Sequence, residues 1–323
     1  MKDTDYAFCV AAIRARETDL FAAPFIKKLV EAEGIKQCMM LLKSVGWLES
    51  EEVSIREAVR NQQEDLWNFI SSSVPDKNVL KYLCVLNDFF NLKVAVKCIF
   101  SKEKPDDFYV KPTTLDLKLL SKAAEKNDYN LLTDSFISNT AMSAYELACK
   151  TENGQNAETV IDSAAIEMLK KHSEAIGKGV YCDICAFIAD TSNIKTAFRC
   201  CFTEKSKDFV NLAISSCFKL DRSRIIEATL NGIEALEAYL SGTCYAYGSS
   251  LYLNDTVKYD KWCDDRIIEI ARGSKYTAFG FDPVCSYYYA KNSEIKTVNM
   301  ILSAKQAGVP QDVLKERVRI AYA

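Results

Sequence analysis

Glycine and proline are scarce in this chain, whose 323 residues include only 11 Gly and 6 Pro. Together they supply roughly 5% of the sequence, where roughly 12% is usual. A sandwich or barrel of many short strands needs these residues at its turns. The scarcity therefore argues against an all-β fold and favours a helical one, and we expect very little sheet.

An excess of positive charge is also missing. The chain carries 41 Lys and Arg against 44 Asp and Glu, a formal net charge of −3. A protein that neutralises a phosphate backbone shows a basic footprint. We therefore expect no nucleic-acid partner.

Long hydrophobic runs are absent as well. A helix that crosses a bilayer needs about 20 predominantly apolar residues. The most apolar stretch, residues 79–100, is interrupted by Lys81, Asn87, Asp88, Asn91, Lys93 and Lys97. The first residues show no apolar core behind a basic start, so we expect no secretory signal. These features predict a cytoplasmic protein without a membrane span of its own.

The motifs of common enzymes are lacking too. No segment fits GxxxxGK[ST] or GxGxxG, the loops that hold nucleotide phosphates. The single histidine, His172, follows two lysines and precedes Ser173 and Glu174, a setting typical of a solvated surface. A Ser-His-Asp or Cys-His mechanism would depend on it. We expect neither nucleotide hydrolysis nor such a mechanism.

What the sequence does contain is an internal repeat with a period near 100 residues. Residues 87–100, NDFFNLKVAVKCIF, resemble residues 189–202, ADTSNIKTAFRCCF, at an offset of 102. A third copy at residues 290–302, AKNSEIKTVNMIL, follows at an offset of 101. Lys93, Lys195 and Lys296 coincide. The repeat predicts three related helical units, at residues 1–105, 106–206 and 207–323.

The repeated segment is typical of an amphipathic helix. Its shared apolar positions recur at spacings of three and four, and they are Leu92/Ile194/Ile295, Ala95/Ala197/Val298 and Ile99/Cys201/Leu302. Such spacing places them on one buried helix face. We expect Asn91, Lys93 and Lys97 on the other sides.

Other segments show helical signals of the same kind. Apolar spacing predicts helix at residues 26–30 and across residues 230–240. Helix starts are expected at Thr114 or Asp116, at Asp221, and at Pro310 with Asp312.

The cysteines are numerous, and their odd number, 13, and irregular spacing favour reduced thiols over a disulfide framework. A CxxC at Cys182 and Cys185, followed by Cys200 and Cys201, raises the alternative of a metal or redox site. The repeat aligns these cysteines mostly with apolar residues, among them Leu83, Ile99, Ile301 and Leu302. Buried cysteine behaves as a small apolar residue. We predict structural thiols, with no metal and no cofactor.

One acidic group offers an enzymatic alternative. Asp265 and Glu269 stand four apart, and Asp264 is adjacent, so the carboxylates share a helix face that could bind Mg²⁺ for a diphosphate substrate. All-α prenyl-transferring enzymes use such faces, with a second acidic cluster opposite. The only other candidate, Asp106-Asp107 after Pro105, fits a helix N-terminus better.

Cations gather near both ends of the chain, in residues 13–17 (IRARE) and residues 315–319 (KERVR). Such runs often only solvate a helix face. The alternative is contact with an acidic partner surface, which arginine suits through its fixed fork of donors. With the repeated lysines, the candidate partner interface consists of Arg14, Arg16, Lys93, Lys195, Lys296, Arg317 and Arg319.

Both ends also carry a family resemblance. Residues 6–17, YAFCVAAIRARE, resemble the opening helix of the C-type subunit of V/A-type rotary ATPases, the prokaryotic relative of the d-type subunit of eukaryotic V-ATPases. Residues 281–296, FDPVCSYYYAKNSEIK, residues 301–310, ILSAKQAGVP, and residues 313–319, VLKERVR, resemble its closing segment. There a Y-x-x-x-K-x-x-E-I run leads to an I-L-x-x-K-x-x-G-x-P turn and an Arg-rich helix.

The resemblance implies an all-α protein of three similar helical units arranged as a funnel with pseudo-threefold symmetry. It implies a non-catalytic part of the central stalk, a monomer within a hetero-oligomeric complex, peripheral to the membrane. Its partners would be the D- and F-type shaft subunits and the membrane proteolipid ring, in a complex that couples ATP hydrolysis or synthesis to H⁺ or Na⁺ transport. The alternatives are an unrelated helical-repeat interaction scaffold and the magnesium-dependent diphosphate enzyme.

Overall fold

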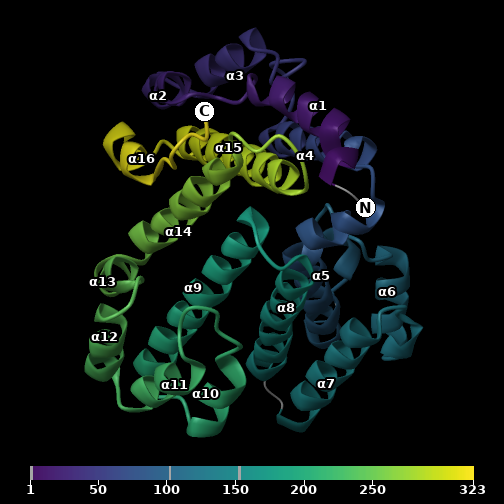
Figure 1. The fold of residues 1–323 in the computed structure, drawn as a ribbon, viewed down its shortest axis with the longest axis vertical. Coiled ribbons are helices and arrows are strands. Elements are labelled where there is room, and N and C mark those ends of the chain that lie inside the picture. The colour runs from purple at the N-terminus through teal and green to yellow at the C-terminus, as the bar shows by residue number, and fades with distance from the viewer. Residues whose placement is uncertain (1–2, 102, 152–153) are drawn as a thin grey trace. The chain divides into compact units, whose positions relative to one another are not determined.

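The computed structural model describes residues 3–101, 103–151 and 154–323, and Figure 1 shows that these residues form helices joined by short connections. They contain sixteen α-helices, five short 3₁₀ turns and no strand. The expected all-α class is confirmed. In chain order the α-helices are α1 (Ala7–Glu17), α2 (Ala23–Glu31), α3 (Ile35–Ser44), α4 (Ile55–Ser73), α5 (Leu80–Ser101), α6 (Leu117–Lys126), α7 (Ser135–Thr151), α8 (Gly154–Ile176), α9 (Val180–Phe202), α10 (Lys207–Ala213), α11 (Arg222–Leu230), α12 (Ile233–Ser241), α13 (Ala246–Asn254), α14 (Thr256–Ala271), α15 (Asp282–Gln306) and α16 (Gln311–Arg317).

The chain forms two compact units. Unit 1 consists of Met1–Lys77, Gly179–Ile184 and Leu251–Ala323, and unit 2 of Asn78–Lys178 and Cys185–Ser250. In unit 1, α15 packs against α1, α3, α4 and α14. In unit 2, α8 packs along both α5 and α7, and Figure 1 shows α7 and α8 side by side. The division into residues 1–105, 106–206 and 207–323 stays a prediction.

The repeated segments form three long helices, α5, α9 and α15, of 22, 23 and 25 residues. Their predicted apolar face is buried: Leu92, Ile194 and Ile295 are at most 1% exposed. The next shared position, Ala95/Ala197/Val298, is fully buried in all three helices. The helix-face prediction is therefore confirmed at these two positions.

The predicted helix starts agree with the observed caps. The side chains of Asp116 and Asp221 each accept hydrogen bonds from two backbone amides in the first turns of α6 and α11, at 2.8–3.1 Å. They satisfy donors that a helix N-terminus leaves without partners. Pro310 directly precedes α16, and Asp312 lies in its first turn.

The helix expected across residues 230–240 is in fact two helices. Helix α11 ends at Leu230 and α12 begins at Ile233. Between them Gly232 has φ +98°, a conformation that glycine adopts at little cost and other residues avoid. The apolar spacing continues across the break, which is why periodicity alone missed it.

Candidate functional site: a buried polar frame and its cations

Helix α5 carries a buried polar pair that fixes the segment before α6. The Asn91 side chain donates to the Val110 carbonyl at 2.9 Å and accepts from the Val110 amide at 2.8 Å. One helical turn earlier, Asp88 accepts from the amide and the hydroxyl of Thr114, at 2.8 and 2.6 Å, and from the Thr113 hydroxyl. Burial raises the pKa of the Asp88 carboxyl, while these hydrogen bonds act in the opposite direction.

Helix α9 repeats this arrangement 102 residues later. Asn193 accepts from the Ser215 amide at 2.9 Å and donates to the Ser215 carbonyl at 3.3 Å. Asp190 accepts from the amides of Phe218 and Lys219 at 2.9 and 2.8 Å, and from the Tyr245 hydroxyl at 2.9 Å. In both helices, an Asp and an Asn one turn apart hold the backbone segment that leads into a later short helix, α6 after α5 and α11 after α9.

In α15 the equivalent positions hold a buried ion pair, Lys291 and Glu294, whose Nζ and Oε1 are 2.6 Å apart. Glu294 also accepts from the Phe21 amide at 2.7 Å and from the Trp47 indole N–H at 3.2 Å. The carboxylate thus ties the end of the chain to the segment before α2. Lys291 and Glu294 belong to the Y-x-x-x-K-x-x-E-I run on which the resemblance rests.

Lys305, the lysine of the I-L-x-x-K-x-x-G-x-P turn, also makes hydrogen bonds within the chain. Lys305 donates to the carbonyls of Val30 and Ala32, at 2.7 and 2.5 Å. These carbonyls lie at the C-terminal end of α2, where they have no partner within the helix and where positive charge is favoured.

The buried polar frame, formed by Asp88 with Asn91, Asp190 with Asn193 and Lys291 with Glu294, was not predicted, and the predicted placement of Asn91 was wrong. Asn91 was expected on a side of the helix away from the buried face, but it is fully buried. A polar residue in a helix usually faces water. Asn91 is buried because its side chain supplies the hydrogen-bond donor and acceptor that the Val110 carbonyl and amide would otherwise lack. The signal was in the repeat, since Asp and Asn recur unchanged at positions 88/190 and 91/193.

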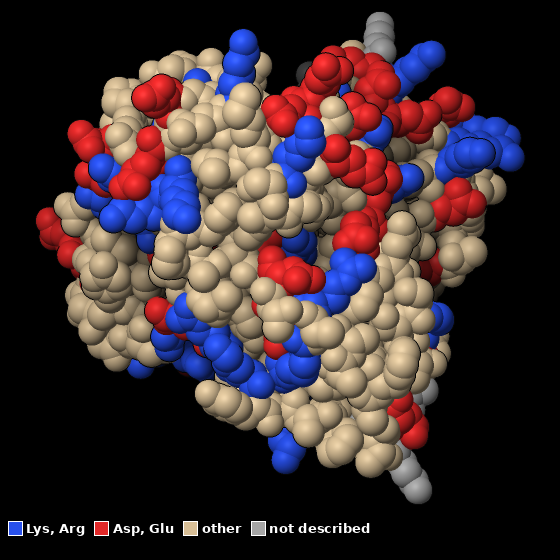
Figure 2. All heavy atoms as spheres, turned by 90° about the horizontal axis from the view of Figure 1, so that it is seen from above, with Lys and Arg blue, Asp and Glu red and all other residues tan. Residues whose placement is uncertain are grey.

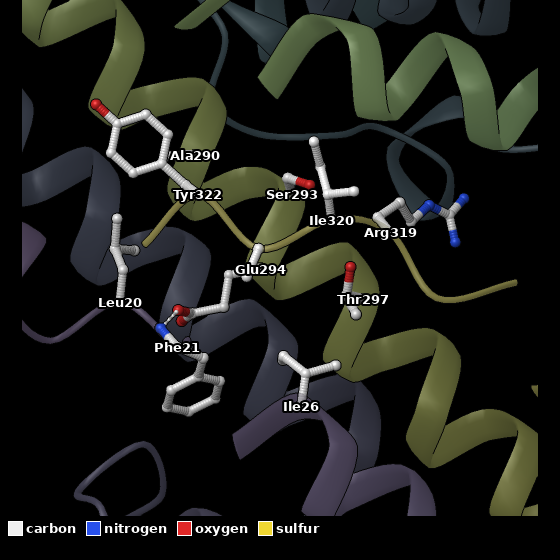
Figure 3. A pocket seen from close by; sticks show the side chains of 11 residues that line it. Leu20, Phe21, Ile26, Ala290, Ser293, Glu294, Thr297, Arg319, Ile320 and Tyr322 are labelled. Carbon is white, nitrogen blue, oxygen red and sulfur yellow. Dashed lines mark hydrogen bonds between the residues drawn. The ribbon is translucent and has the colours of Figure 1, made fainter. Parts of the chain in front are cut away.

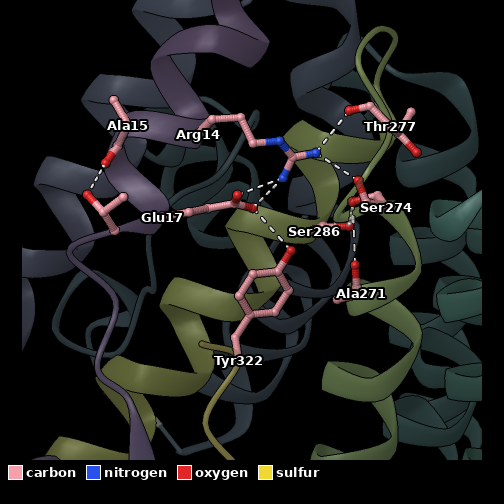
Figure 4. A network of polar contacts seen from close by, with 9 residues as sticks. Arg14, Ala15, Glu17, Ala271, Ser274, Thr277, Ser286 and Tyr322 are labelled. Carbon is pink, nitrogen blue, oxygen red and sulfur yellow. Dashed lines mark hydrogen bonds and ion pairs between the residues drawn. The ribbon is translucent and has the colours of Figure 1, made fainter.

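Four of the seven candidate cations pair with an acidic side chain of their own unit. Arg14 pairs with Glu17 at 2.6 Å and donates to the carbonyls of Ser274 and Thr277 at 2.7 and 2.9 Å (Figure 4). Arg319 pairs with Asp264 at 2.9 Å. In unit 2, Lys93 pairs with Asp162 of α8.

Arg16, Lys296 and Arg317 are more accessible than these three. Arg16 is paired with Asp65 at 2.7 Å and stacks 4.6 Å from the Phe69 ring centre, yet 39% of its side chain is exposed. Lys195 is half-buried, and Lys296 and Arg317 are exposed. On the face drawn in Figure 2, basic and acidic side chains mostly lie beside one another in mixed groups, with uncharged residues between the groups.

The acidic face of α14 differs from a magnesium site. Asp264 accepts a hydrogen bond from Arg319. Asp265 accepts from Lys261 and, at 2.8 Å, from the Ile320 amide. Glu269 accepts from Arg266 at 2.6 Å. Cations of the chain itself thus take the place that a metal would need. Among the described residues, no group of three or more His, Cys, Asp or Glu side chains could hold a metal ion.

The histidine is not the solvated residue that its neighbours suggested. The ring of His172 packs edge-on against Tyr82, with 4.8 Å between ring centres, and its Nδ1 is buried without a hydrogen-bond partner. Burial, together with the charges of Lys81 and Lys171, lowers the pKa of His172 to about 4. The imidazole is therefore neutral at physiological pH.

The thirteen cysteines all lie among the described residues, and none of them forms a disulfide bond. Cys185 and Cys200 are buried, as their alignment with apolar residues predicted, while Cys182 and Cys201 are half-buried. Burial raises the pKa of Cys200 to about 11, so its reactive thiolate form is disfavoured at neutral pH.

Comparison with known proteins gives this frame a context. The sequence profile of the ATP synthase (C/AC39) subunit family matches residues 9–317. The chain belongs to this family. It is 21% identical over 319 residues to the C-type subunit of the V-type sodium ATPase of Enterococcus hirae, covering 96% of this chain and 97% of that protein. It is 23% identical over 336 residues to the C-type subunit of the A-type ATP synthase of Methanocaldococcus jannaschii, covering 93% and 82%.

The C/AC39 family is one of accessory subunits rather than catalytic ones. In this C/AC39 chain, none of the described helices is long and apolar enough to cross a membrane. One small pocket in unit 1, shown in Figure 3, lies between the segment before α2, helix α15 and residues 319–322. It has room for about one water molecule, far less than a nucleotide requires.

Proposed function

We propose that this protein is the non-catalytic central-stalk subunit of a V/A-type rotary ATPase, which links the rotating shaft to the membrane proteolipid ring. The proposal rests on the family match over residues 9–317. Two relatives that align over most of their length are named as C-type subunits, one of a V-type sodium ATPase and one of an A-type ATP synthase. The proposed partners are the D- and F-type shaft subunits and the ring, with H⁺ or Na⁺ as the transported ion.

The proposed architecture is three similar helical units of about 100 residues, in a funnel with pseudo-threefold symmetry. It is supported by the polar anchors, because Asp88 with Asn91 and Asp190 with Asn193 bind equivalent segments in the same way. In the third copy, Glu294 binds the amide of Phe21, before α2. The proposed units are residues 1–105, 106–206 and 207–323.

The frame suits a part that transmits torque. A rotor adaptor must resist shear between helices, and buried charged hydrogen bonds tie helices together at fixed positions. The proposed adaptor works at the cytoplasmic side of the membrane, bound to the complex and without chemistry of its own.

A reconstitution experiment tests this proposal. Vesicles are prepared with the rotary ATPase of the source organism, with and without this protein. We expect complexes that lack it to hydrolyse ATP without pumping ions, and pumping to return when the purified chain is added. Ion pumping that is unchanged without the protein would contradict the proposal.

A second experiment tests the partner contacts. Of the seven candidates, we propose that the more accessible Arg16, Lys296 and Arg317 meet acidic partner surfaces, with the half-buried Lys195 as a further candidate, while Arg14, Lys93 and Arg319 act mainly within the chain. A single exposed contact contributes about 1 kcal/mol or less, so the substitution to test is triple: Arg16→Ala, Lys296→Ala and Arg317→Ala.

We expect the triple variant to restore pumping only at a higher concentration of added protein. The matched control removes three other exposed cations: Lys27, Arg60 and Lys150. Equal restoration by the two variants would show that charge in general, and not these positions, matters for assembly.

A further inference from the structure

Unit 1 ends in a segment without helical structure, residues 318–323, which follows α16. Its sequence is Val-Arg-Ile-Ala-Tyr-Ala. Although it has no secondary structure of its own, Tyr322 is only 6% exposed and residues 318–321 are half-buried. We call residues 318–323 the strap.

The strap is held by both its backbone and its side chains. The Ile320 amide donates to Asp265 at 2.8 Å, and Arg272 donates to the carbonyls of Ala321 and Tyr322, the latter at 3.2 Å. Backbone bonds of this kind bind an extended segment whatever its sequence.

Two side chains add selectivity. The Arg319 guanidinium pairs with Asp264 at 2.9 Å and contacts the Met300 sulfur at 3.0 Å. Three residues on, the Tyr322 hydroxyl donates to Glu17 at 3.1 Å, and Glu17 is in turn paired with Arg14 (Figure 4). A basic residue meets the acidic face of α14, and an aromatic ring is buried beside α1.

The body of unit 1 forms a groove beneath the strap. In Figure 3, strap residues lie over a pocket whose other walls come from the segment before α2 and from α15. These walls are Leu20, Phe21, Ile26, Ala290, Ser293, Glu294 and Thr297. The groove thus offers what peptide-binding sites use: fixed partners for an extended backbone, a charged position and a partly apolar floor, formed by Leu20, Phe21, Ile26 and Ala290.

We propose that this groove is a peptide-binding site for an extended segment of the pattern Arg-aliphatic-small-Tyr, which the chain fills with its own residues 319–322. The occupant in trans is a partner segment of that pattern, because Asp264 and Glu17 select an arginine and a tyrosine hydroxyl three residues apart. Since the strap contributes no turn to any helix, it leaves the groove without unwinding one. This site is separate from the proposed coupling role and does not depend on it.

The test uses the full chain with the strap loosened and the groove intact. In the variant R319A/Y322A, every groove residue remains while the two selective contacts of the strap are lost. The probe is a fluorescently labelled hexapeptide, Val-Arg-Ile-Ala-Tyr-Ala, followed by fluorescence anisotropy. We expect it to bind the variant at least about tenfold more tightly than the wild type, whose groove is filled.

Two controls define the site. Adding D264N and D265N to the variant should weaken binding by about tenfold or more, as should replacing Arg and Tyr of the probe by Ala. Equal binding to the wild type and the variant, or binding that survives both controls, would overturn the proposal.

Hydrogen exchange gives a second measurement that needs no added peptide. In the wild-type background, D264N/D265N should speed exchange of the strap amides by about tenfold, because Arg319 loses its ion pair and the Ile320 amide keeps only a weaker, neutral acceptor. D312N, on the exposed face of the adjacent α16, should leave that exchange unchanged. Strap protection that persists in D264N/D265N would show that the groove does not hold the strap.

Discussion

Replacing Glu294 by alanine should destabilise unit 1 more than any exposed charge substitution. The change removes an acceptor shared by the Phe21 amide, the Trp47 indole and the Lys291 ammonium group. The side chains of Lys291 and Glu294 are only 11% and 6% exposed. Removing one partner of a buried ion pair costs about 3–5 kcal/mol, because the other charge stays buried without compensation. We therefore expect the free energy of unfolding to fall by about 4 kcal/mol.

The chain supplies a matched control in Glu269, which pairs with Arg266 at the same i,i+3 spacing and the same 2.6 Å distance. Their side chains are 53% and 47% exposed, so E269A should cost about 1 kcal/mol or less. The two variants differ in burial and in the two further hydrogen bonds that Glu294 accepts from Phe21 and Trp47. Similar losses from E294A and E269A would refute the reasoning.

A double substitution separates the cost of the unpaired charge from that of lost packing. In K291M/E294Q both charges leave together, and the glutamine carbonyl still accepts from a buried N–H. Replacing both members of a buried pair costs far less than removing one. We expect the double variant to be more stable than E294A by about 2 kcal/mol.

Tryptophan fluorescence during urea unfolding is the appropriate assay. All three tryptophans, at positions 47, 67 and 262, fall within the residue ranges of unit 1. The signal therefore reports unit 1 even where the two units unfold separately, a case in which a global transition has no single free energy.

Three further predictions concern other parts of the frame and the thiols. N91A should lower the stability of unit 2 by about 2 kcal/mol, measured by circular dichroism in urea, since two hydrogen bonds to Val110 are lost. Iodoacetamide at pH 7.5 should label the exposed Cys149 in the folded protein and leave Cys200 unmodified, and rapid labelling of Cys200 would contradict this prediction. Elemental analysis should find no stoichiometric zinc or iron. His172 has a folded pKa of about 4, below its ordinary 6.5, so the unfolded chain binds the extra proton and stability should fall as pH drops from about 6.5 to about 4. H172Q should reduce that fall, and an NMR titration giving an ordinary pKa would refute the argument.

Sequence periodicity and capping chemistry predicted the helices well because both act locally. Leu92, Ile194 and Ile295 lie on a buried face because spacings of three and four fix that face. Asp116 and Asp221 cap helices because a short acidic side chain reaches amides two and three residues ahead.

The parts that sequence reasoning missed depend on residues far apart in the chain. Asp264 and Asp265 resembled a metal-binding face, and only the fold brings Arg319 and Ile320 to them. Asn91 was expected at the surface because no local sequence rule identifies a side-chain amide that hydrogen-bonds a distant backbone segment, here Val110. The placement of Arg14 against the carbonyl of Ser274 spans 260 residues, beyond the reach of any periodic pattern.

The hydrogen bonds from Phe21 and Trp47 to Glu294 have a consequence for biosynthesis. Unit 1 joins the first and last parts of the chain, so Phe21 and Trp47 leave the ribosome long before the carboxylate that they bind. At about 5–20 residues per second, translation of residues 74–281, between α4 and α15, takes roughly 10–40 s. During that time the apolar faces of α1–α4 have no α15 to cover them, whereas unit 2 is complete once Ser250 has been added. The nascent amino-terminal helices are thus the part of this protein that most needs a chaperone.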